Sequence, residues 1–488
     1  MAGVAATAVI GGCNDAPVAR TTSEAARLAE ARRTATGGRL VTSRLVARPV
    51  RLDLGGPVVS TWGYADDLPG PVIRAAAGDR LRVDVDNQLP ADTSVHWHGI
   101  ALSNAMDGVP GMTQEPIEPG GRFRYEFTVP DPGTYFYHPH SGVQLDRGLY
   151  GVLIVDDPAE PGGYDAEWTV VLDDWLDGTG RTPDEVLAKL ISSGAPGGMG
   201  GIGGMGGMDG MAGMGGRSTG AGGTPLGDAG DVVYPHYLVN GRVPAAPDTF
   251  AAKPGQVVRI RLINAGSDTA FRVALAGHRM TVTHTDGFPV ERESTDALIV
   301  GMGERFDVRV TLGDGVFPLV ALAEGKTGGG RALIRTGAGA VPGTAFRPAE
   351  LGKRVLLGTD LSAAPSVRLS RARPDRTHDV VLGASMAGGY AWTLNGRQFP
   401  DMAALPVRAQ ERIRLRFTNQ TMMFHPMHLH GHTFGVTEGG ARKDTVIVRP
   451  MQRVEVDLLA DNPGIWALHC HNIYHAETGM LTALTYRT

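Results

Sequence analysis

Histidines are the residues in this sequence with the clearest capacity for chemistry, and most of them gather in four short segments. A neutral imidazole is the commonest metal ligand in proteins. Ten of the 15 histidines lie in these clusters, which random scatter would not produce. The clusters are His96 and His98; His138 and His140; His425, His428 and His430; and His469, His471 and His475.

The spacing inside the clusters suggests how they would be used. Each cluster contains two histidines separated by one residue, and residues i and i+2 of a strand point to the same face. In the last cluster, His469 and His471 would face one side and Cys470 the other. One tripeptide could therefore serve two neighbouring metal sites that are joined by a few covalent bonds.

The Cys470 side of this tripeptide needs further ligands. His475 and Met480 lie close downstream, and His425 is available from the preceding cluster. Two imidazoles, a thiolate and a weak axial thioether are the set that blue-copper electron-transfer sites favour. Zinc also takes His and Cys, but zinc alone leaves eight histidines unexplained. These eight are imidazole-only and suit copper: His96, His98, His138, His140, His428, His430, His469 and His471.

The five remaining histidines stand apart from this pattern. An isolated histidine is more often a hydrogen-bonded structural residue than a ligand. We therefore interpret these five histidines as structural: His236, His278, His284, His378 and His432.

Strands must position the clustered ligands. Glycine (69) and proline (32) are abundant, and short alternating runs recur, which is typical of all-β proteins. One alternating pattern occurs three times, at residues 78–87, 255–264 and 410–419. Residues 131–138 and 462–469 also resemble each other. Each segment has a Pro-Gly turn followed by a strand that carries histidines. The matching middle strand, 315–323, has no histidine, so the middle unit is interpreted as scaffold.

The repeats divide the chain, whose length corresponds to about three domains at roughly 150 residues each. We expect three related Greek-key β-sandwich or barrel domains. They would follow an N-terminal leader and extension, 1–45, and span residues 46–158, 159–347 and 348–488. A short helix is expected to begin near Thr182, within residues 176–191.

A segment of glycine and methionine, 194–216, falls outside the repeat. Soft thioethers prefer Cu(I), so this loop is a candidate gatherer of cuprous ions, although a plain flexible linker is the alternative. Its methionines are Met199, Met205, Met208, Met211 and Met214.

Charge and cysteines limit the partners. The net charge of -5 is small and mixed, which argues against a nucleic-acid partner. No later stretch approaches the roughly 18 to 20 apolar residues of a membrane span. Cys13 ends a small, apolar run in which Ile10-Gly-Gly-Cys13 looks like a bacterial lipobox, although no basic segment precedes it. We expect an exported envelope or extracellular protein, with a lipid anchor at Cys13 as one option.

At this point the sequence resembles the multicopper oxidase family, which includes laccases and bacterial cuprous oxidases. The motifs are His96-Trp-His-Gly99, Tyr137-His-Pro-His-Ser-Gly142, His425-Pro-Met-His-Leu-His-Gly431, and His469-Cys-His through Met480. The leader and the Gly/Met insert look most similar to actinobacterial lipoprotein copper oxidases. The resemblance covers nearly everything after about Val46. It implies three cupredoxin domains and four copper ions.

The resemblance also implies how the ligands are shared. The type 1 copper would take His425, Cys470, His475 and Met480. The trinuclear site, between the first and third domains, would hold a type 2 copper on His96 and His428. One type 3 copper would lie on His98, His138 and His471, and the other on His140, His430 and His469.

Carboxylates complete the expected site, because the reduction of dioxygen consumes protons. Asp107 matches a family carboxylate that is thought to deliver them. Many relatives carry a second acid directly after the last type 1 histidine, but here that residue is Ala476, so the following Glu477 is the candidate. Asp444 also resembles a recurrent family element. We leave it outside the site, because a structural hydrogen bond explains it at least as well as substrate contact.

The resemblance implies an oxidase that takes one electron at a time at Cys470 and reduces dioxygen to water with four. The methionines favour Cu(I) as the donor and a role in copper tolerance, with Fe(II), Mn(II), phenols and aromatic amines open. A laccase that oxidises phenols without any metal-oxidase role is the alternative. A copper nitrite reductase or a non-catalytic cupredoxin relative is disfavoured, because every ligand position is filled.

Overall fold

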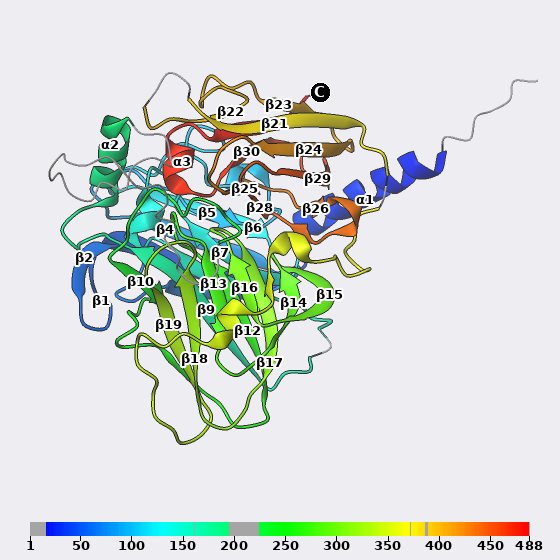
Figure 1. Cartoon of the computed structure of the whole chain (residues 1–488). Helices are drawn as coiled ribbons and strands as arrows, with labels where there is room; N and C mark the ends of the chain where they lie inside the picture. The colour runs from blue at the N-terminus through cyan, green and yellow to red at the C-terminus, as the bar shows by residue number, and fades with distance from the viewer. Residues whose placement is uncertain (1–15, 161, 195–223, 371, 386–388, 488) are drawn as a thin grey trace, which may run out of the picture.

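The protein is almost entirely β-structure, as expected from its sequence (Figure 1). A computed structural model describes residues 16–160, 162–194, 224–370, 372–385 and 389–487. Six sheets pair into three sandwiches along the chain. In Figure 1 the green strands of the second sandwich lie below the orange and red strands of the third. The predicted all-β, three-domain cupredoxin-like architecture is thus confirmed.

The first sandwich has two four-stranded sheets. One consists of β2 (Val58–Gly63), β1 (Leu40–Asp53), β4 (Arg80–Asn87) and β6 (Arg122–Thr128). The other consists of β3 (Gly70–Ala76), β8 (Gly151–Asp156), β7 (Gly133–His138) and β5 (His96–His98). Strand β1 pairs from Leu40 onward with β4, so this sheet begins before residue 46.

The second sandwich has two six-stranded sheets. The first contains β10 (His236–Val239), β9 (Ala166–Trp175), β12 (Val257–Asn264), β17 (Arg305–Thr311), β14 (Met280–Thr285) and β15 (Phe288–Thr295). The second contains β11 (Thr249–Ala251), β19 (Gly329–Arg335), β18 (Val316–Ala323), β13 (Phe271–Leu275), β16 (Ala297–Val300) and β20 (Val355–Leu356). Because β20 pairs with β16, this sheet extends beyond residue 347.

The third sandwich combines a six-stranded and a five-stranded sheet. The larger contains β22 (Trp392–Leu394), β21 (Arg376–Ala384), β24 (Arg412–Asn419), β29 (Arg453–Leu459), β26 (Phe434–Val436) and β27 (Arg442–Lys443). The smaller contains β23 (Leu405–Val407), β31 (Leu481–Tyr486), β30 (Ile465–Cys470), β25 (His425–Leu429) and β28 (Thr445–Val448).

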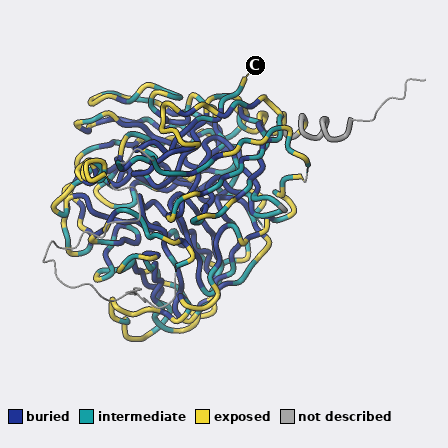
Figure 2. Tube along the Cα trace, turned by 45° about the horizontal axis from the view of Figure 1, so that its top comes forward, coloured by how far each residue is buried: buried dark blue, intermediate teal, exposed yellow. Residues whose placement is uncertain are grey.

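The repeated sequence pattern corresponds to one equivalent strand in each sandwich. These strands are β4, β12 and β24. Each pairs in parallel with the first strand of its sandwich (β1, β9 or β21) and antiparallel with a later one (β6, β17 or β29). Apolar and polar residues alternate in these strands because one face packs into a sandwich core. Figure 2 shows this buried interior in dark blue.

Helices are few. The chain forms α1 (Ala16–Thr34), α2 (Pro183–Ser193) and α3 (Ile473–Glu477), with short 3-10 turns between strands. Helix α2 begins where the sequence predicted, because Thr182 and Glu185 form a capping box. Helix α1 was not predicted. Near its end Arg32 pairs with Asp131 at 3.0 Å. Within the described part of the chain, no helix combines the length and apolar character needed to cross a bilayer.

Candidate metal centre

Two strand pairs bring the histidine clusters together. In the first sandwich, β5 pairs with β7 and sets His96 opposite His138. In the third, β25 pairs with β30 and sets His428 opposite His469. The clustered histidines then divide into two groups. Eight of them meet between the first and third sandwiches, and the other two lie with Cys470 inside the third.

The eight-histidine group is compact. Nε2 of His430 lies 3.0 Å from Nε2 of His469, and Nε2 of His140 lies 3.4 Å from the same atom. The rings of His96 and His430 stack with centroids 3.7 Å apart, as do those of His98 and His428. Three triplets have their ligand atoms within 4.8 Å of one another: His96, His98 and His428; His98, His138 and His471; and His140, His430 and His469.

The inward-facing nitrogens of this group fit a set of metal ions. Buried polar atoms are normally hydrogen-bonded, yet several imidazole nitrogens here have no hydrogen-bond partner among the described residues. They are Nε2 of His96, His138 and His428, Nδ1 of His98, and both ring nitrogens of His471. Since these atoms converge from several strands on one buried space, the donor set is the one that copper ions would complete.

The opposite ring nitrogens are held by the protein. Nδ1 of His96 contacts the carbonyl oxygen of Asp107 at 2.8 Å. Nδ1 of His138 and Nδ1 of His469 contact the carbonyl oxygens of Pro139 and Cys470, each at 2.8 Å. Such outer hydrogen bonds fix the tautomer and ring orientation of metal-binding histidines.

Burial keeps these imidazoles neutral. It lowers the pKa of His98, His138 and His140 well below the usual value, and neighbouring histidines lower it further. For His469, burial and the nearby His428 lower the pKa to about 3. A neutral imidazole keeps a free lone pair at physiological pH, so the group is ready to bind a cation without first losing protons.

The second group surrounds the only cysteine in the described residues. Sγ of Cys470 lies 3.6 Å from Nδ1 of His475 and 3.7 Å from Nδ1 of His425. Met480 is fully buried next to them, with backbone hydrogen bonds to Cys470 and His475. Burial raises the pKa of the Cys470 thiol. A metal ion would bind the thiolate, so its binding would release a proton.

The outer nitrogens of the second group are also fixed. Nε2 of His425 contacts Oγ1 of Thr421 at 2.9 Å, and Nε2 of His475 contacts Oδ2 of Asp231 at 3.0 Å. The Trp392 ring packs over His475 with centroids 4.0 Å apart. The two Nδ1 atoms are thereby directed at Cys470.

Both predicted acids lie beside the eight-histidine group. Asp107 is fully buried, and its Oδ2 lies 2.9 Å from Nδ1 of His430. Glu477, at the end of α3, lines a cavity of about 10 Å³ together with His138 and His471. Glu477 is itself exposed, and the neighbouring protein raises the pKa of its carboxyl to about 7. Asp107 therefore contacts a ligand directly, whereas Glu477 lines a cavity next to the ligands.

Three residues around the site were not predicted to take part in it. Asp444, which the sequence left outside the site, lies 3.1 Å from Nε2 of His98 through its Oδ1. Burial would raise its pKa, but Arg305 and the histidine contacts hold the pKa of Asp444 well below its usual value. The other two are Arg305 itself and Asp231. Both residues are far from the histidine motifs in sequence, and nothing in their own patterns marks them.

Isolated histidines have structural partners where contacts are described. Nε2 of His432 contacts the Tyr486 hydroxyl at 2.7 Å. His278 contacts the carbonyl oxygen of Ala276 at 2.7 Å, and His378 that of Pro406 at 3.0 Å.

Some of the methionines lie outside the described residues. The five loop methionines, Met199, Met205, Met208, Met211 and Met214, all lie there. Two described methionines are strongly exposed, Met422 (65%) and Met451 (69%). Met422 precedes His425 by three residues, and its carbonyl accepts a hydrogen bond from the amide of Asp228 at 3.0 Å. Of the two, Met422 is the one close in sequence to a histidine of the cysteine group.

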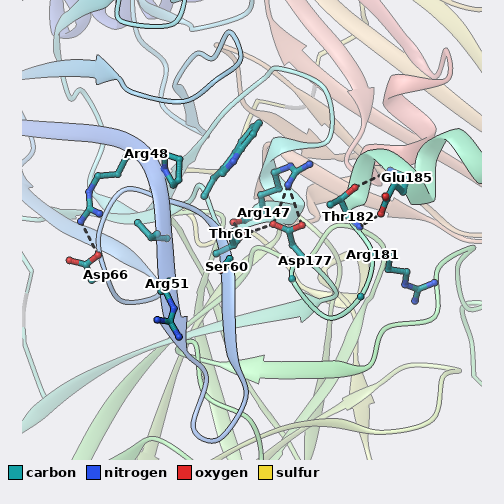
Figure 3. A pocket seen from close by; sticks show the side chains of 15 residues that line it. Arg48, Arg51, Ser60, Thr61, Asp66, Arg147, Asp177, Arg181, Thr182 and Glu185 are labelled. Atoms are coloured by element: carbon teal, nitrogen blue, oxygen red, sulfur yellow. Dashed lines mark hydrogen bonds and ion pairs between the residues drawn. The ribbon is translucent and has the colours of Figure 1, made fainter.

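A cavity of about 720 Å³ lies away from the histidines, between β1, β2 and the start of α2 (Figure 3). Its charges largely neutralise one another. Arg48 pairs with Asp66 at 2.9 Å, and Arg147 pairs with Asp177 at 3.1 Å. Arg147 also lies over the Trp62 ring. We assign this cavity no part in the metal centre.

Comparisons with known proteins agree with this geometry. Models described as multicopper oxidase match residues 48–160, 211–338 and 372–488. Multicopper oxidase MmcO of Mycobacterium tuberculosis is 50% identical over 99% of this chain and 95% of that protein. A copper resistance protein A homolog of Pseudomonas syringae pv. tomato is 30% identical over 85% of this chain and 87% of that protein.

Solved structures show the same fold. A multi-copper oxidase from Pseudomonas thermotolerans has a TM-score of 0.67 and 28% identity, covering 92% of this chain and 100% of that one. The laccase from Botrytis aclada has a TM-score of 0.75 and 23% identity, covering 93% and 88%.

Proposed function

This chain belongs to the multicopper oxidase family, and we propose that it oxidises Cu(I), in copper tolerance, with dioxygen as the electron acceptor. It is an oxidoreductase with copper as its cofactor. When bound, copper accepts single electrons at the cysteine site and reduces dioxygen to water with four electrons at the three-ion site.

We assign the ligands as the family resemblance implies. The type 1 copper is held by His425, Cys470, His475 and Met480, and the type 2 copper by His96 and His428. The type 3 pair is held by His98, His138 and His471, and by His140, His430 and His469. Two of the compact triplets have the same membership as the two proposed type 3 sets, which supports the assignment. The unpaired inward nitrogens support it independently.

Cys470 connects the two sites. Its thiolate would bind copper on one face of β30, and the adjacent His469 and His471 belong to the eight-histidine group. The electron path from the donor therefore runs through the backbone of three consecutive residues. A short covalent path fits a protein that must collect four electrons, one at a time.

The two acids, Asp107 and Glu477, would supply protons for the reduction of dioxygen. Asp107 holds Nδ1 of His430 through Oδ2, so it orients a ligand and can deliver a proton beside the three-ion site. Glu477 lines the small cavity next to His138 and His471, which makes it the candidate for a second route from solvent.

The preference for Cu(I) is supported by the surroundings of His475 and His425. Asp231 places a carboxylate against the outer nitrogen of His475, which favours the approach of a cation. The exposed thioether of Met422, three residues before His425, adds a soft ligand type that suits Cu(I). The contact of Asp231 with His475 is the observation that carries the substrate proposal.

Laccase-like oxidation of phenols is the second candidate. Laccase-2 of Cryptococcus neoformans var. grubii is 27% identical to this chain, over 86% of this chain and 79% of that protein. The carboxylate of Asp231 beside the type 1 histidine His475 favours a metal ion over a neutral phenol. Fe(II) and Mn(II) are also cations, with a higher charge than Cu(I), but they prefer harder ligands than thioethers.

The test is a steady-state comparison of Cu(I), Fe(II) and a phenol under matched conditions, with oxygen consumption as the common readout. We expect kcat/KM to be highest for Cu(I). A higher kcat/KM for the phenol would replace the proposal with the laccase alternative. Absence of oxygen consumption with all three donors would contradict both.

We also propose that the protein is exported and anchored by a lipid on Cys13, which lies outside the described residues. The support is the Ile10-Gly-Gly-Cys13 sequence. Cys13→Ser should move the protein from the membrane fraction to the soluble fraction, and mass spectrometry should show the loss of a lipid. If the wild-type protein is already soluble and unmodified, the anchor is refuted.

A further inference from the structure

The middle sandwich forms one wall of the eight-histidine group, although it contributes none of the proposed ligands. The turn before β17 contains Gly303, with φ at 81°. A Cβ atom at this position would lie 2.7 Å from Cδ2 of His471 and 3.0 Å from Cε1 of His98. Only a glycine lets the turn approach the imidazoles this closely. The second domain is therefore in direct contact with the site.

Arg305 follows this turn and binds Asp444 of the third sandwich with two parallel hydrogen bonds. Nη1 of Arg305 donates to Oδ1 at 2.7 Å, and Nη2 donates to Oδ2 at 2.6 Å. Nε of Arg305 donates to the carbonyl oxygen of Thr134, in the first sandwich, at 3.0 Å. Arg305 and Asp444 are fully buried. One guanidinium thus joins all three sandwiches and fixes the plane of the Asp444 carboxylate.

Asp444 in turn holds two of the histidines. Its Oδ1 lies 3.1 Å from Nε2 of His98, and its carbonyl oxygen lies 3.0 Å from Nδ1 of His428. These contacts keep the proton on Nε2 of His98 and on Nδ1 of His428. The lone pairs of the opposite nitrogens, Nδ1 of His98 and Nε2 of His428, then face the site, and these are among the nitrogens that lack a partner.

A second layer of buried charges supports this pair. Nζ of Lys443 contacts Asp286 at 3.0 Å and Glu304 at 3.1 Å. Asp286 accepts hydrogen bonds from the amides of Arg305, at 2.9 Å, and Asp444, at 3.2 Å. Burying such ions is costly, and apolar residues often stabilise a protein as well or better. Stability alone therefore gives a weak reason for this cluster, and positioning gives a stronger one.

Gly99, directly after His98, leaves the space in which this bond forms. A Cβ at residue 99 would lie 2.4 Å from Nη2 of Arg305 and 2.6 Å from Oδ2 of Asp444. Its φ of 86° is also a conformation that favours glycine. The motif around His98 is therefore fitted to the ion pair as well as to a metal.

We propose that Arg305 is a positioning residue for the three-ion site, which through Asp444 sets the tautomers and ring orientations of His98 and His428. This inference rests on the proposed assignment of those two histidines to copper. The effect is local, because Arg305 has no contact with Cys470, His425 or His475 among the described interactions.

The test replaces Arg305 by Lys and by Met in the full-length copper-loaded protein. Lysine keeps the charge but cannot form two parallel bonds to a carboxylate. We expect both variants to retain the blue absorption of the cysteine site. The electron paramagnetic resonance signal of the type 2 copper should shift, and copper at the three-ion site should be held about 10- to 100-fold more weakly, as for other outer-shell partners. The lysine variant should be the milder.

Arg272→Met is the matched control, because Arg272 forms another largely buried pair, with Glu324, in the same sandwich. It should lower the melting temperature without changing the type 2 signal. A type 2 signal and copper content in both Arg305 variants equal to those of the wild type would overturn the proposal. If Arg305→Met fails to fold, Arg305→Lys decides alone. His428→Ala separates the two hypotheses, since unchanged type 2 copper there would refute the ligand assignment itself.

Discussion

His469 and Cys470 are consecutive residues whose side chains enter different ligand groups. Nε2 of His469 lies 3.0 Å from Nε2 of His430, whereas Sγ of Cys470 lies 3.6 Å from Nδ1 of His475. Strand β30 makes this possible, because successive side chains alternate between its faces. Chemistry at the two groups can therefore be separated by changing one residue at a time.

Cys470→Ser should remove the blue thiolate-to-copper absorption and the turnover of one-electron donors. The eight-histidine group does not use the sulfur, so copper there should remain largely bound. Visible absorption, copper content per chain and oxygen consumption measure the three effects. Retained turnover in the absence of the blue band would contradict the proposed electron path.

Asp107→Asn should slow dioxygen reduction by about 100-fold, the usual scale for loss of a positioned proton donor. The amide keeps the size of the carboxyl and can still meet Nδ1 of His430, so copper content should stay close to that of the wild type. Rapid-mixing of the reduced protein with oxygen isolates this step. A normal rate would assign proton delivery elsewhere, with Glu477→Gln as the next variant.

Asp231→Asn should raise KM for Cu(I) several-fold and leave KM for a neutral phenol nearly unchanged. The reason is the loss of a negative charge beside His475, while the amide can still contact the ring. Increasing the salt concentration should reduce the difference between wild type and variant for Cu(I). Equal changes for both donors would indicate an altered copper site and contradict a role in cation attraction.

Replacing the five loop methionines by serine should impair Cu(I) oxidation several-fold more than phenol oxidation. A second variant, Met422→Ser with Met451→Ser, applies the same test to the two strongly exposed methionines of the described residues. Steady-state kcat/KM for both donors is the measurement. Unchanged rates in the first variant would mean that the loop has no role in cuprous oxidation.

We expect Asp307→Asn to change how the stability of the folded protein depends on pH, at a position away from the metal centre. Burial would raise the pKa of Asp307, but Arg261 and Arg259 hold it below its usual value. A carboxyl with a lowered folded-state pKa stabilises the protein above its unfolded pKa and loses that contribution as the pH falls. The variant should be less stable by about 3 kcal/mol near pH 7. The difference from the wild type should shrink below about pH 4.

Melting temperatures across this pH range provide the measurement. Asp84→Asn is the control, because Asp84 pairs with Arg124 at the exposed surface, and little change is expected. A constant difference between wild type and Asp307→Asn at all pH values would show that the charge of Asp307 is not responsible.

The sequence predicted those features that are written in local patterns. Alternation revealed β4, β12 and β24, and the spacing of two between His469 and His471 predicted that they share a face. Arg305 could not be found in this way. Its strand, beginning Arg305-Phe-Asp-Val, alternates like a strand with one solvent face, but the arginine face is covered by the other two sandwiches. Asp231 escaped detection because 244 residues separate it from His475.

The eight-histidine group draws on strands that are far apart in the sequence, and this affects how the protein matures. His96 precedes His469 and His471 by most of the described sequence, so it is synthesised well before them. A chain that stops before β30 would carry the first half of the pocket with nothing to close it. Assembly of the oxygen-reducing centre must therefore wait until β30 has been synthesised and has paired with β25.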